Sequence, residues 1–313
     1  MTAFCAQISR DVAEPLPGTG GHPGSNLLLS WPSGRWSKTF NLAKDMTSDE
    51  ADAIAALAES GRRLNLIDRK AQSSTTHRAY LMPESRAFDV PRAELVAFFS
   101  ALKTGQSLTG WEVSDIPDSV VLCCTHGKKD RCCAKFGNAS YKALTAAAVT
   151  RPEAIEIWQS THLGGCRLAT SILVFPQARK YGRVDADKAD AFLDSESKDR
   201  PFLPCYRGDR LLSPEQQVAE VAIRHHLAQQ NIWPDRLEPE SDTDLYGGRK
   251  TITLRWLSGT EYGQLSVLLA PETVQRFGTC TAMDDGEEPV AHNTWQVVSV
   301  FAEGSLIALA SQP

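Results

Sequence analysis

Four cysteines in two adjacent pairs constrain the fold of this chain more than any other feature of its sequence. The apolar run Val120-Val121-Leu122 leads directly into Cys123-Cys124, and a short polar loop separates that pair from Cys132-Cys133. Small and β-branched apolar residues favour a buried strand, so we expect a strand from Ser119 to Cys124. A chain that places four thiols within eleven positions is expected to use them as a group.

A second polar loop, residues 161–166, carries His162, Gly164-Gly165 and Cys166 and follows another predicted strand, Ile155 to Gln159. The helix predicted between the two strands would serve as the crossover that parallel neighbours require. Two glycines let the backbone pass close to a metal centre. Both loops follow predicted strands, so we interpret them as one site for a metal centre, most plainly a 2Fe–2S cluster.

Alternation along a strand limits which thiols can share this site. Cys123 and Cys124 point to opposite faces, and the end of the strand favours Cys124 as the ligand. Cys132 and Cys133, at the start of a helix, remain open alternatives on this argument. With His162 and Cys166 the donors are three thiolates and one imidazole, which also suit structural zinc. Zinc knuckles, however, space their cysteines more closely than the two pairs allow.

Charge and composition limit the partners. The chain has 313 residues, and 33 Lys and Arg against 38 Asp and Glu give a net charge of −5. This balance argues against nucleic acid or an anionic membrane as the main partner. No apolar run reaches the roughly 18 residues of a membrane span, and the N-terminus lacks the pattern of a secretory leader. We therefore expect a cytoplasmic protein, where eight cysteines favour metal or redox chemistry over disulfides. Cys5, Cys205 and Cys280 are isolated in sequence and are expected to be structural.

Periodicity and turn residues predict an α/β (α+β) fold in three parts: a layered unit over residues 1–112, a central unit over 113–210 and a C-terminal region over 211–313. The first unit has the predicted order β-α-β-β-α, with strands 27–31, 63–67 and 78–82 and helices 48–59 and 91–103. The central unit has the order β-α-β-β-β-α, with strands 119–124, 155–159, 171–176 and 180–184 and helices 130–149 and 185–193. The last region is predicted to hold a helix that begins after Ser213 and a small antiparallel sheet with strands 251–256, 265–269 and 295–301.

Several motifs together resemble the sucrase/ferredoxin-like family of thioredoxin-like 2Fe–2S ferredoxins. They are the motif at 124–137, the motif H-x-G-G-x-R at 162–167, Tyr181-Gly182-Arg183-Val184, residues 14–19 and Tyr206-Arg207-Gly208. The resemblance implies that the central unit is a thioredoxin-like ferredoxin domain. It also implies the ligands Cys124, Cys133, His162 and Cys166, and so favours Cys133 over Cys132. Cys166 stands where many members of the family have a second histidine.

We therefore expect an electron carrier rather than a stand-alone enzyme, with one 2Fe–2S cluster and an unidentified redox partner protein. An imidazole in place of one thiolate should raise the potential relative to an all-cysteine centre, and its free nitrogen would couple reduction to a proton. The alternatives are a structural zinc protein with a Cys3His site that acts by partner binding, and a cluster-based sensor or reductase. The role of His126, the oligomeric state and the pathway stay open.

Overall fold

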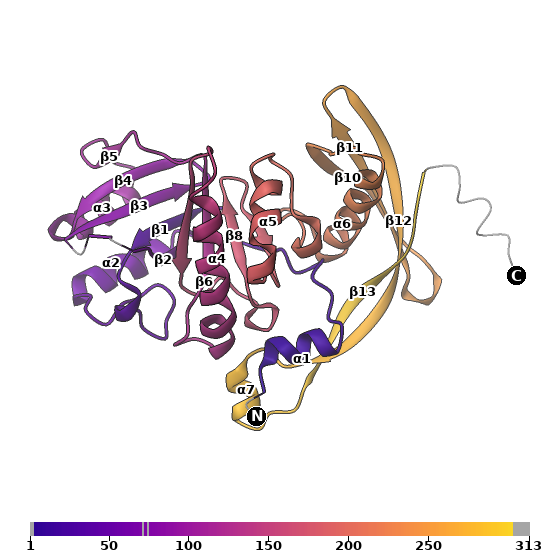
Figure 1. The fold of residues 1–313 in the computed structure, drawn as a ribbon, viewed down its shortest axis with the longest axis horizontal. Helices are drawn as coiled ribbons and strands as arrows, with labels where there is room; N and C mark the ends of the chain where they lie inside the picture. Colours follow the sequence, from indigo (N-terminus) through magenta and orange to yellow (C-terminus); the bar gives the residue numbers. More distant parts are fainter. Residues whose placement is uncertain (1–2, 71, 74, 303–313) are drawn as a thin grey trace, which may run out of the picture.

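The computed structural model describes residues 3–302 except 71 and 74. Its architecture is a mixed α/β fold with one large sheet of nine strands and a separate antiparallel sheet of four strands (Figure 1). The fold class expected from the sequence is confirmed. No helix within the described ranges is long and apolar enough to cross a membrane.

Nine strands form the large sheet in the order β5-β4-β3-β1-β2-β7-β6-β8-β9. They are β1 (Asn26–Ser30), β2 (Arg63–Asp68), β3 (Thr76–Met82), β4 (Arg86–Pro91), β5 (Glu112–Val113), β6 (Ser119–Cys124), β7 (Ile155–Ser160), β8 (Ile172–Phe175) and β9 (Arg179–Tyr181). The pairs β1–β2 and β6–β7 are parallel, and every other pair is antiparallel. β1 is buried along its whole length, and β6 is buried at every residue after Ser119, which explains their unbroken apolar runs.

The chain order within this sheet occurs twice. The first half, residues 26–104, has the order β1-α2-β2-β3-β4-α3, with α2 (Ser48–Ala58) and α3 (Leu95–Thr104). The second half, residues 119–196, has the order β6-α4-β7-β8-β9-α5, with α4 (Asn138–Ala148) and α5 (Ala189–Glu196). In each half a helix crosses between two parallel strands, as parallel pairing requires, and an antiparallel hairpin follows. The halves meet where β2 pairs with β7 through Ile67–Ser160 and Asp68–Gln159.

Two details of the first half differ from the sequence prediction. Thr47 rather than Ser48 caps α2, because its side chain accepts from Glu50 N–H while Glu50 binds back to Thr47 N–H. Pro91 does not begin a helix but ends β4, a strand that the sequence analysis missed. Proline can occupy this place because the end of a strand does not need its N–H for the ladder. Gly105 ends α3 with a φ of 69°, the left-handed helix end predicted for it.

The C-terminal sheet packs against a single helix, α6 (Pro214–Gln229). The helix begins as predicted, because Ser213 and Gln216 form a capping box and Pro214 occupies the first turn. The sheet has the order β10-β11-β12-β13, with strands β10 (Arg236–Asp244), β11 (Lys250–Ser258), β12 (Glu261–Arg276) and β13 (Val290–Phe301). β10 was not predicted, since Pro239 interrupts its pattern at an irregularity in the pairing.

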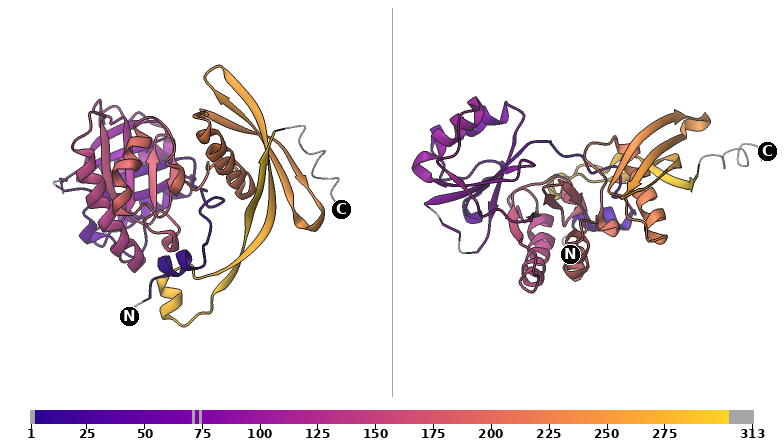
Figure 2. Two further views of the ribbon diagram at one scale, coloured as in Figure 1. Left: turned by 45° about the vertical axis from the view of Figure 1, so that its right-hand side comes forward. Right: turned by 90° about the horizontal axis from the view of Figure 1, so that it is seen from above.

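The N-terminal end of the described chain meets the turn between β12 and β13 beside the second half. The long ribbon of β12 and β13 turns through α7 (Cys280–Asp284), and α1 (Cys5–Asp11) lies next to it (Figures 1 and 2). A small apolar cluster joins both helices to the start of the helix that follows β6, through Cys5, Ala6, Cys132, Ala169 and Cys280. Segments at opposite ends of the sequence are therefore held on one surface.

Candidate metal centre

Two loops of the second half leave the same edge of the sheet. β6 and β7 are parallel, and Cys124 at the end of β6 is paired in register with Ser160 at the end of β7. The loops that follow begin at Thr125 and Thr161, whose N–H groups are bound by Ser160 O and Leu66 O. The parallel register predicted from the sequence thus places both ligand loops side by side.

The end of β6 separates its two cysteines as strand alternation requires. Cys124 lies in a buried cluster with Leu122, Cys133 and Cys166. Cys123 points to the other face, where its thiol donates to Gly137 O at 3.4 Å. Only Cys124 of this pair faces the second loop.

The helix after β6 separates the other pair. Asp130 caps it, because Oδ1 accepts from Cys132 N–H at 2.8 Å, as predicted for this residue. Its second turn is a π-helix, Cys133–Gly137, and such turns are frequent at functional sites. Gly137 lets the turn approach β6 closely, because a Cβ there would lie 2.0 Å from Cys124 O. Cys133 thereby reaches Cys124, while Cys132 points into a different cluster.

The second loop brings His162 and Cys166 to the same place. Gly164 and Gly165 have φ of 90° and 79°, values that favour glycine, and they turn the chain so that Cys166 Sγ lies 3.4 Å from His162 Nδ1. Donor atoms of Cys124, Cys133 and His162 lie within 4.8 Å of one another. The structure therefore brings all four predicted ligands together.

His126 supports this arrangement without a free ring nitrogen. Nδ1 accepts from His162 N–H at 3.3 Å, and Nε2 is 2.7 Å from Ser37 O. Burial, partly opposed by the bond to Ser37, lowers the pKa of His126, so the neutral ring donates through Nε2. The residue positions the loop of His162 and is not available as a ligand in this geometry.

Neighbouring thiols and the imidazole favour charge at the site. The bond from Cys133 outweighs burial and lowers the pKa of the Cys166 thiol to about 7, and the same donor holds the pKa of Cys124 well below its usual value. Burial lowers the pKa of His162, but Cys124 and Cys166 outweigh it and raise the pKa to about 9. Thiolates are the form that binds metal, and Cys124 and Cys166 are shifted towards it, whereas the bonds to Cys124 and Cys166 raise the pKa of the Cys133 thiol well above its usual value.

Two arginines and a lysine surround the second loop, with Arg207 and Lys180 buried and Arg63 partly buried, and the sequence analysis did not identify them as part of the site. Arg63 donates to His162 O at 2.6 Å, Arg207 to Gly164 O at 3.4 Å, and Lys180 to Gly21 O at 2.9 Å. None of the three forms an ion pair with a carboxylate in the described part of the chain. Of these three residues, only Arg207 belonged to a motif that the sequence analysis singled out, Tyr206-Arg207-Gly208. Such charges stabilise a negatively charged centre.

The remaining cysteines differ from their sequence interpretation in one respect. Cys205 is isolated and buried, and its thiol donates to Arg183 O at 3.4 Å. Cys5 and Cys280, which are isolated in sequence, are not isolated in space: both lie against Cys132. Neither contact could be seen from spacing, because Cys132 is 127 positions from Cys5 and 148 from Cys280.

Comparison with known protein families matches residues 16–208 to the family described as sucrase/ferredoxin-like. No curated protein matches the chain. Among solved structures, two of a thioredoxin-like [2Fe–2S] ferredoxin from Aquifex aeolicus are similar at 18% identity and a TM-score of 0.26. They cover 28% of this chain and 88% and 94% of theirs.

Proposed function

The chain belongs to the sucrase/ferredoxin-like family, and we propose that it is an electron-transfer protein with one 2Fe–2S cluster bound by Cys124, Cys133, His162 and Cys166. The observation that carries the proposal is the convergence of these four side chains from two loops at one sheet edge. A 2Fe–2S cluster supplies a site that accepts and releases one electron.

The residues present fit such a cluster in kind and in charge. The donors form two pairs by sequence, Cys124 with Cys133 and His162 with Cys166, so that each pair can serve one iron. Three thiolates and a neutral imidazole would leave the oxidised centre with about one net negative charge. The partly buried Arg63 and the buried Arg207 would offset that charge and the further charge of reduction.

Access to the site is limited to one side. His162 is partly exposed, whereas Cys124, Cys133 and Cys166 are buried, so an electron would enter or leave near the imidazole. Lys128, in the loop that follows β6, donates to Gly34 O at 3.0 Å. This bond joins the loop after β6 to the loop after β1, and both loops carry basic side chains.

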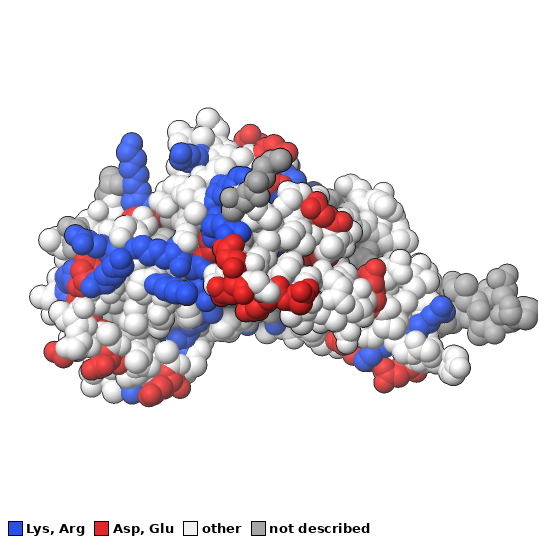
Figure 3. Space-filling model, turned by 90° about the horizontal axis from the view of Figure 1, so that it is seen from below, with Lys and Arg blue, Asp and Glu red and all other residues white. Residues whose placement is uncertain are grey.

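These loops form a basic patch of exposed side chains, Arg35, Lys38, Lys44 and Lys128. Figure 3 shows Lys and Arg side chains gathered on one part of a face, next to a group of Asp and Glu. We propose that the redox partner docks here with an acidic surface, since complementary charge raises association rates. Exchange of Lys38 and Lys44 for Glu should slow electron transfer and reduce its dependence on salt. Unchanged rates at low ionic strength would exclude this surface.

A single Zn²⁺ ion is the second candidate for the same donors. It is favoured by compactness, because donor atoms of three residues lie within 4.8 Å of one another, and Cys3His is a common structural zinc set. Metal and acid-labile sulfide analysis of anaerobically purified protein separates the two. We expect about two irons and two sulfides per chain and a brown colour. A colourless protein that contains zinc instead of iron and sulfide would refute the proposed cluster.

The proposal extends to protons. Reduction adds a negative charge beside His162, which raises the pKa of its free ring nitrogen, so reduction would take up a proton between the two pKa values. We expect the potential to fall by about 59 mV per pH unit in that window. His162→Cys should lower the potential and remove the slope. A native potential that stays flat from acid to alkaline pH would exclude a titrating histidine ligand.

A further inference from the structure

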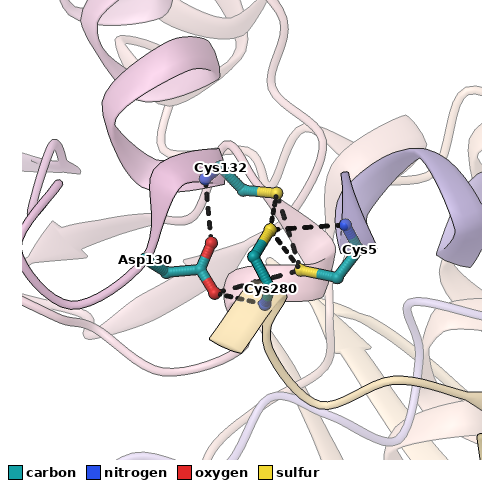
Figure 4. Close-up of side chains that lie close together, drawn as sticks. All are labelled: Cys5, Asp130, Cys132 and Cys280. Atoms are coloured by element: carbon teal, nitrogen blue, oxygen red, sulfur yellow. Dashed lines mark hydrogen bonds between the residues drawn. The ribbon is translucent and has the colours of Figure 1, made fainter. Parts of the chain in front are cut away.

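A second group of side chains of metal-binding types lies next to the first, because the neighbouring residues Cys132 and Cys133 belong to different groups. Cys5, Asp130, Cys132 and Cys280 come from α1, the cap of the helix after β6, that helix itself and α7, and their donor atoms meet within 4.8 Å (Figure 4). All four are at most 3% exposed. Cys5 and Cys280 lie outside the residues that match the family.

The spacing of the sulfur atoms suits one tetrahedral ion. The three Sγ–Sγ distances are 3.5 Å for Cys5–Cys132, 3.2 Å for Cys132–Cys280 and 3.5 Å for Cys5–Cys280. A disulfide requires about 2.05 Å, and a disulfide between any two would leave the third thiol over. A Zn–S bond of about 2.3 Å gives a tetrahedral edge of about 3.8 Å. The three thiols thus form a triangle whose edges are about 0.3–0.6 Å shorter than those of one face of a zinc site.

Asp130 completes the tetrahedron and indicates that a cation belongs there. Its Oδ2 lies 4.0 Å from Cys5 Sγ and accepts from Cys280 N–H at 2.8 Å, while Oδ1 accepts from Cys132 N–H. Within the described ranges no Lys or Arg forms an ion pair with this buried carboxylate, because its neighbour Arg131 pairs with Asp284. A buried carboxylate among thiols is costly unless a positive charge compensates it.

Backbone N–H groups already point at the sulfur atoms. Cys5 N–H donates to Cys280 Sγ at 3.4 Å, and Ala6 N–H donates to Cys132 Sγ at 3.5 Å. Hydrogen bonds of this kind orient metal ligands and spread their charge. The four ligands and these donors leave no position for water or substrate, which is typical of structural rather than catalytic zinc.

We propose that Cys5, Cys132, Cys280 and Asp130 bind one structural Zn²⁺ ion, separate from the candidate iron centre. Helices α1 and α7 have 7 and 5 residues, and helices this short are marginal in water without tertiary support. The ion would fasten the N-terminal helix and the turn between β12 and β13 to the helix that carries Cys133. Neighbouring residues of one helix would then serve two metal centres, and this proposal stands whether or not the first centre holds iron.

The test is metal content after dialysis against EDTA under native conditions. We expect about one zinc per chain in the full-length protein. Cys5→Ser and Cys280→Ser should lose the zinc and keep the iron and sulfide of the wild type, because neither residue touches the first centre. Cys205→Ser, a buried thiol outside both groups, is the matched control and should keep both metals.

X-ray absorption at the zinc edge of the unmodified protein serves even if a variant fails to fold. It should show three sulfur neighbours at about 2.3 Å and one oxygen at about 2.0 Å. Wild-type protein without zinc after dialysis, a zinc content in both serine variants equal to that of the wild type, or a Cys132–Cys280 disulfide detected by alkylation of the unreduced chain would overturn the proposal.

Discussion

The two halves of the large sheet share one topology but end their central strands differently. The β1–β3 pairing opposes Asn26 to Met82, and the β6–β8 pairing opposes Val120 to Phe175. If Asn26 and Val120 are taken as equivalent positions, the residues four positions later are also equivalent. Ser30 of the first half then corresponds to Cys124 of the second. Residues 26–104 contain no cysteine. The repeated fold therefore contains the same strand end twice, after β1 and after β6, and only the end of β6 carries thiols.

Aromatic packing fills the corresponding corner of the first half. The ring of Trp31 stacks on His77 with centroids 4.4 Å apart, and Arg92 lies 4.7 Å above the Trp31 ring. His77 Nδ1 is 2.5 Å from Ser30 O. The comparison teaches that the strand-end geometry alone does not create a metal centre. The residue types there decide it, and the first half contributes by support, since Arg63 of β2 holds the His162 loop.

The largest effect should follow from giving the second half the residue of the first. Cys124→Ser places the counterpart of Ser30 at the end of β6, and it should abolish the cluster because a serine hydroxyl does not replace a thiolate. Cys123→Ser is the matched control, since its side chain points to the opposite face. Iron, sulfide and visible absorption measure the result. Loss of colour in Cys123→Ser with retention in Cys124→Ser would reverse the assignment.

A substitution in the aromatic packing of the first half should lower the stability of the fold and leave metal binding in the second half intact. Trp31→Ala removes a side chain that is 1% exposed, and such truncations cost about 3–5 kcal/mol. Urea unfolding gives the stability, and iron per chain in the folded fraction gives the occupancy. Trp31→Phe, which keeps an aromatic ring, should cost less. An empty centre in folded Trp31→Ala protein would show that the first half has a direct part in the site.

The repetition was hidden from sequence analysis by one strand. The hairpins Pro83-Glu84-Ser85-Arg86 and Pro176-Gln177-Ala178-Arg179 match, with φ of 51° at Ser85 and 57° at Ala178. The prediction included the second hairpin but omitted β4, because Arg86 to Pro91 alternates weakly and ends in proline. The first half was therefore taken as β-α-β-β-α instead of β-α-β-β-β-α.

Local chemistry could be predicted better than long-range assembly. Strand alternation separated Cys123 from Cys124, the end of the strand favoured Cys124, and the start of a helix after Ser213 was identified from neighbouring residues. The cluster of Cys5 with Cys280 and the cations around the second loop depend on tertiary folding that brings distant segments together. Spacing along the chain contains no information about such contacts, so only the structure revealed them.

A smaller effect concerns the reduction potential of the proposed cluster. Lys180 stands where the first half has Ala87, one residue after the arginine of each hairpin. Burial, with the charges of Arg207 and Arg63, lowers the pKa of Lys180 to about 6. Below that pH its ammonium would stabilise the reduced form of the proposed cluster. Lys180→Met should lower the potential by about 30–60 mV at pH 5.5, as for about 0.7–1.4 kcal/mol per electron, and by less at pH 8.

A spectroelectrochemical titration measures this shift. Lys142→Met, on the exposed side of α4, is the control and should leave the potential unchanged. An equal shift in both variants, or none in Lys180→Met at acid pH, would contradict an electrostatic role for Lys180.

The smallest effect concerns the contact between the halves. His22 Nε2 is 2.8 Å from Asn26 Oδ1 in the first half, and the ring lies edge-on to Phe175 of the second at 6.4 Å. Burial outweighs the bond to Asn26 and lowers the pKa of His22 to about 3. The unfolded chain binds this proton near pH 6.5, so stability falls as the pH drops from about 6.5 towards 3.

His22→Gln keeps an N–H for Asn26 and cannot titrate in this range. Relative to the variant, the wild type should therefore lose about 1 kcal/mol between pH 7.5 and pH 5, a figure reduced for the partial exposure of the ring. Urea midpoints of both proteins across this range measure the difference. Parallel pH profiles would show that His22 has the same pKa in the folded and the unfolded chain, and would exclude a ring that folding keeps neutral at acid pH.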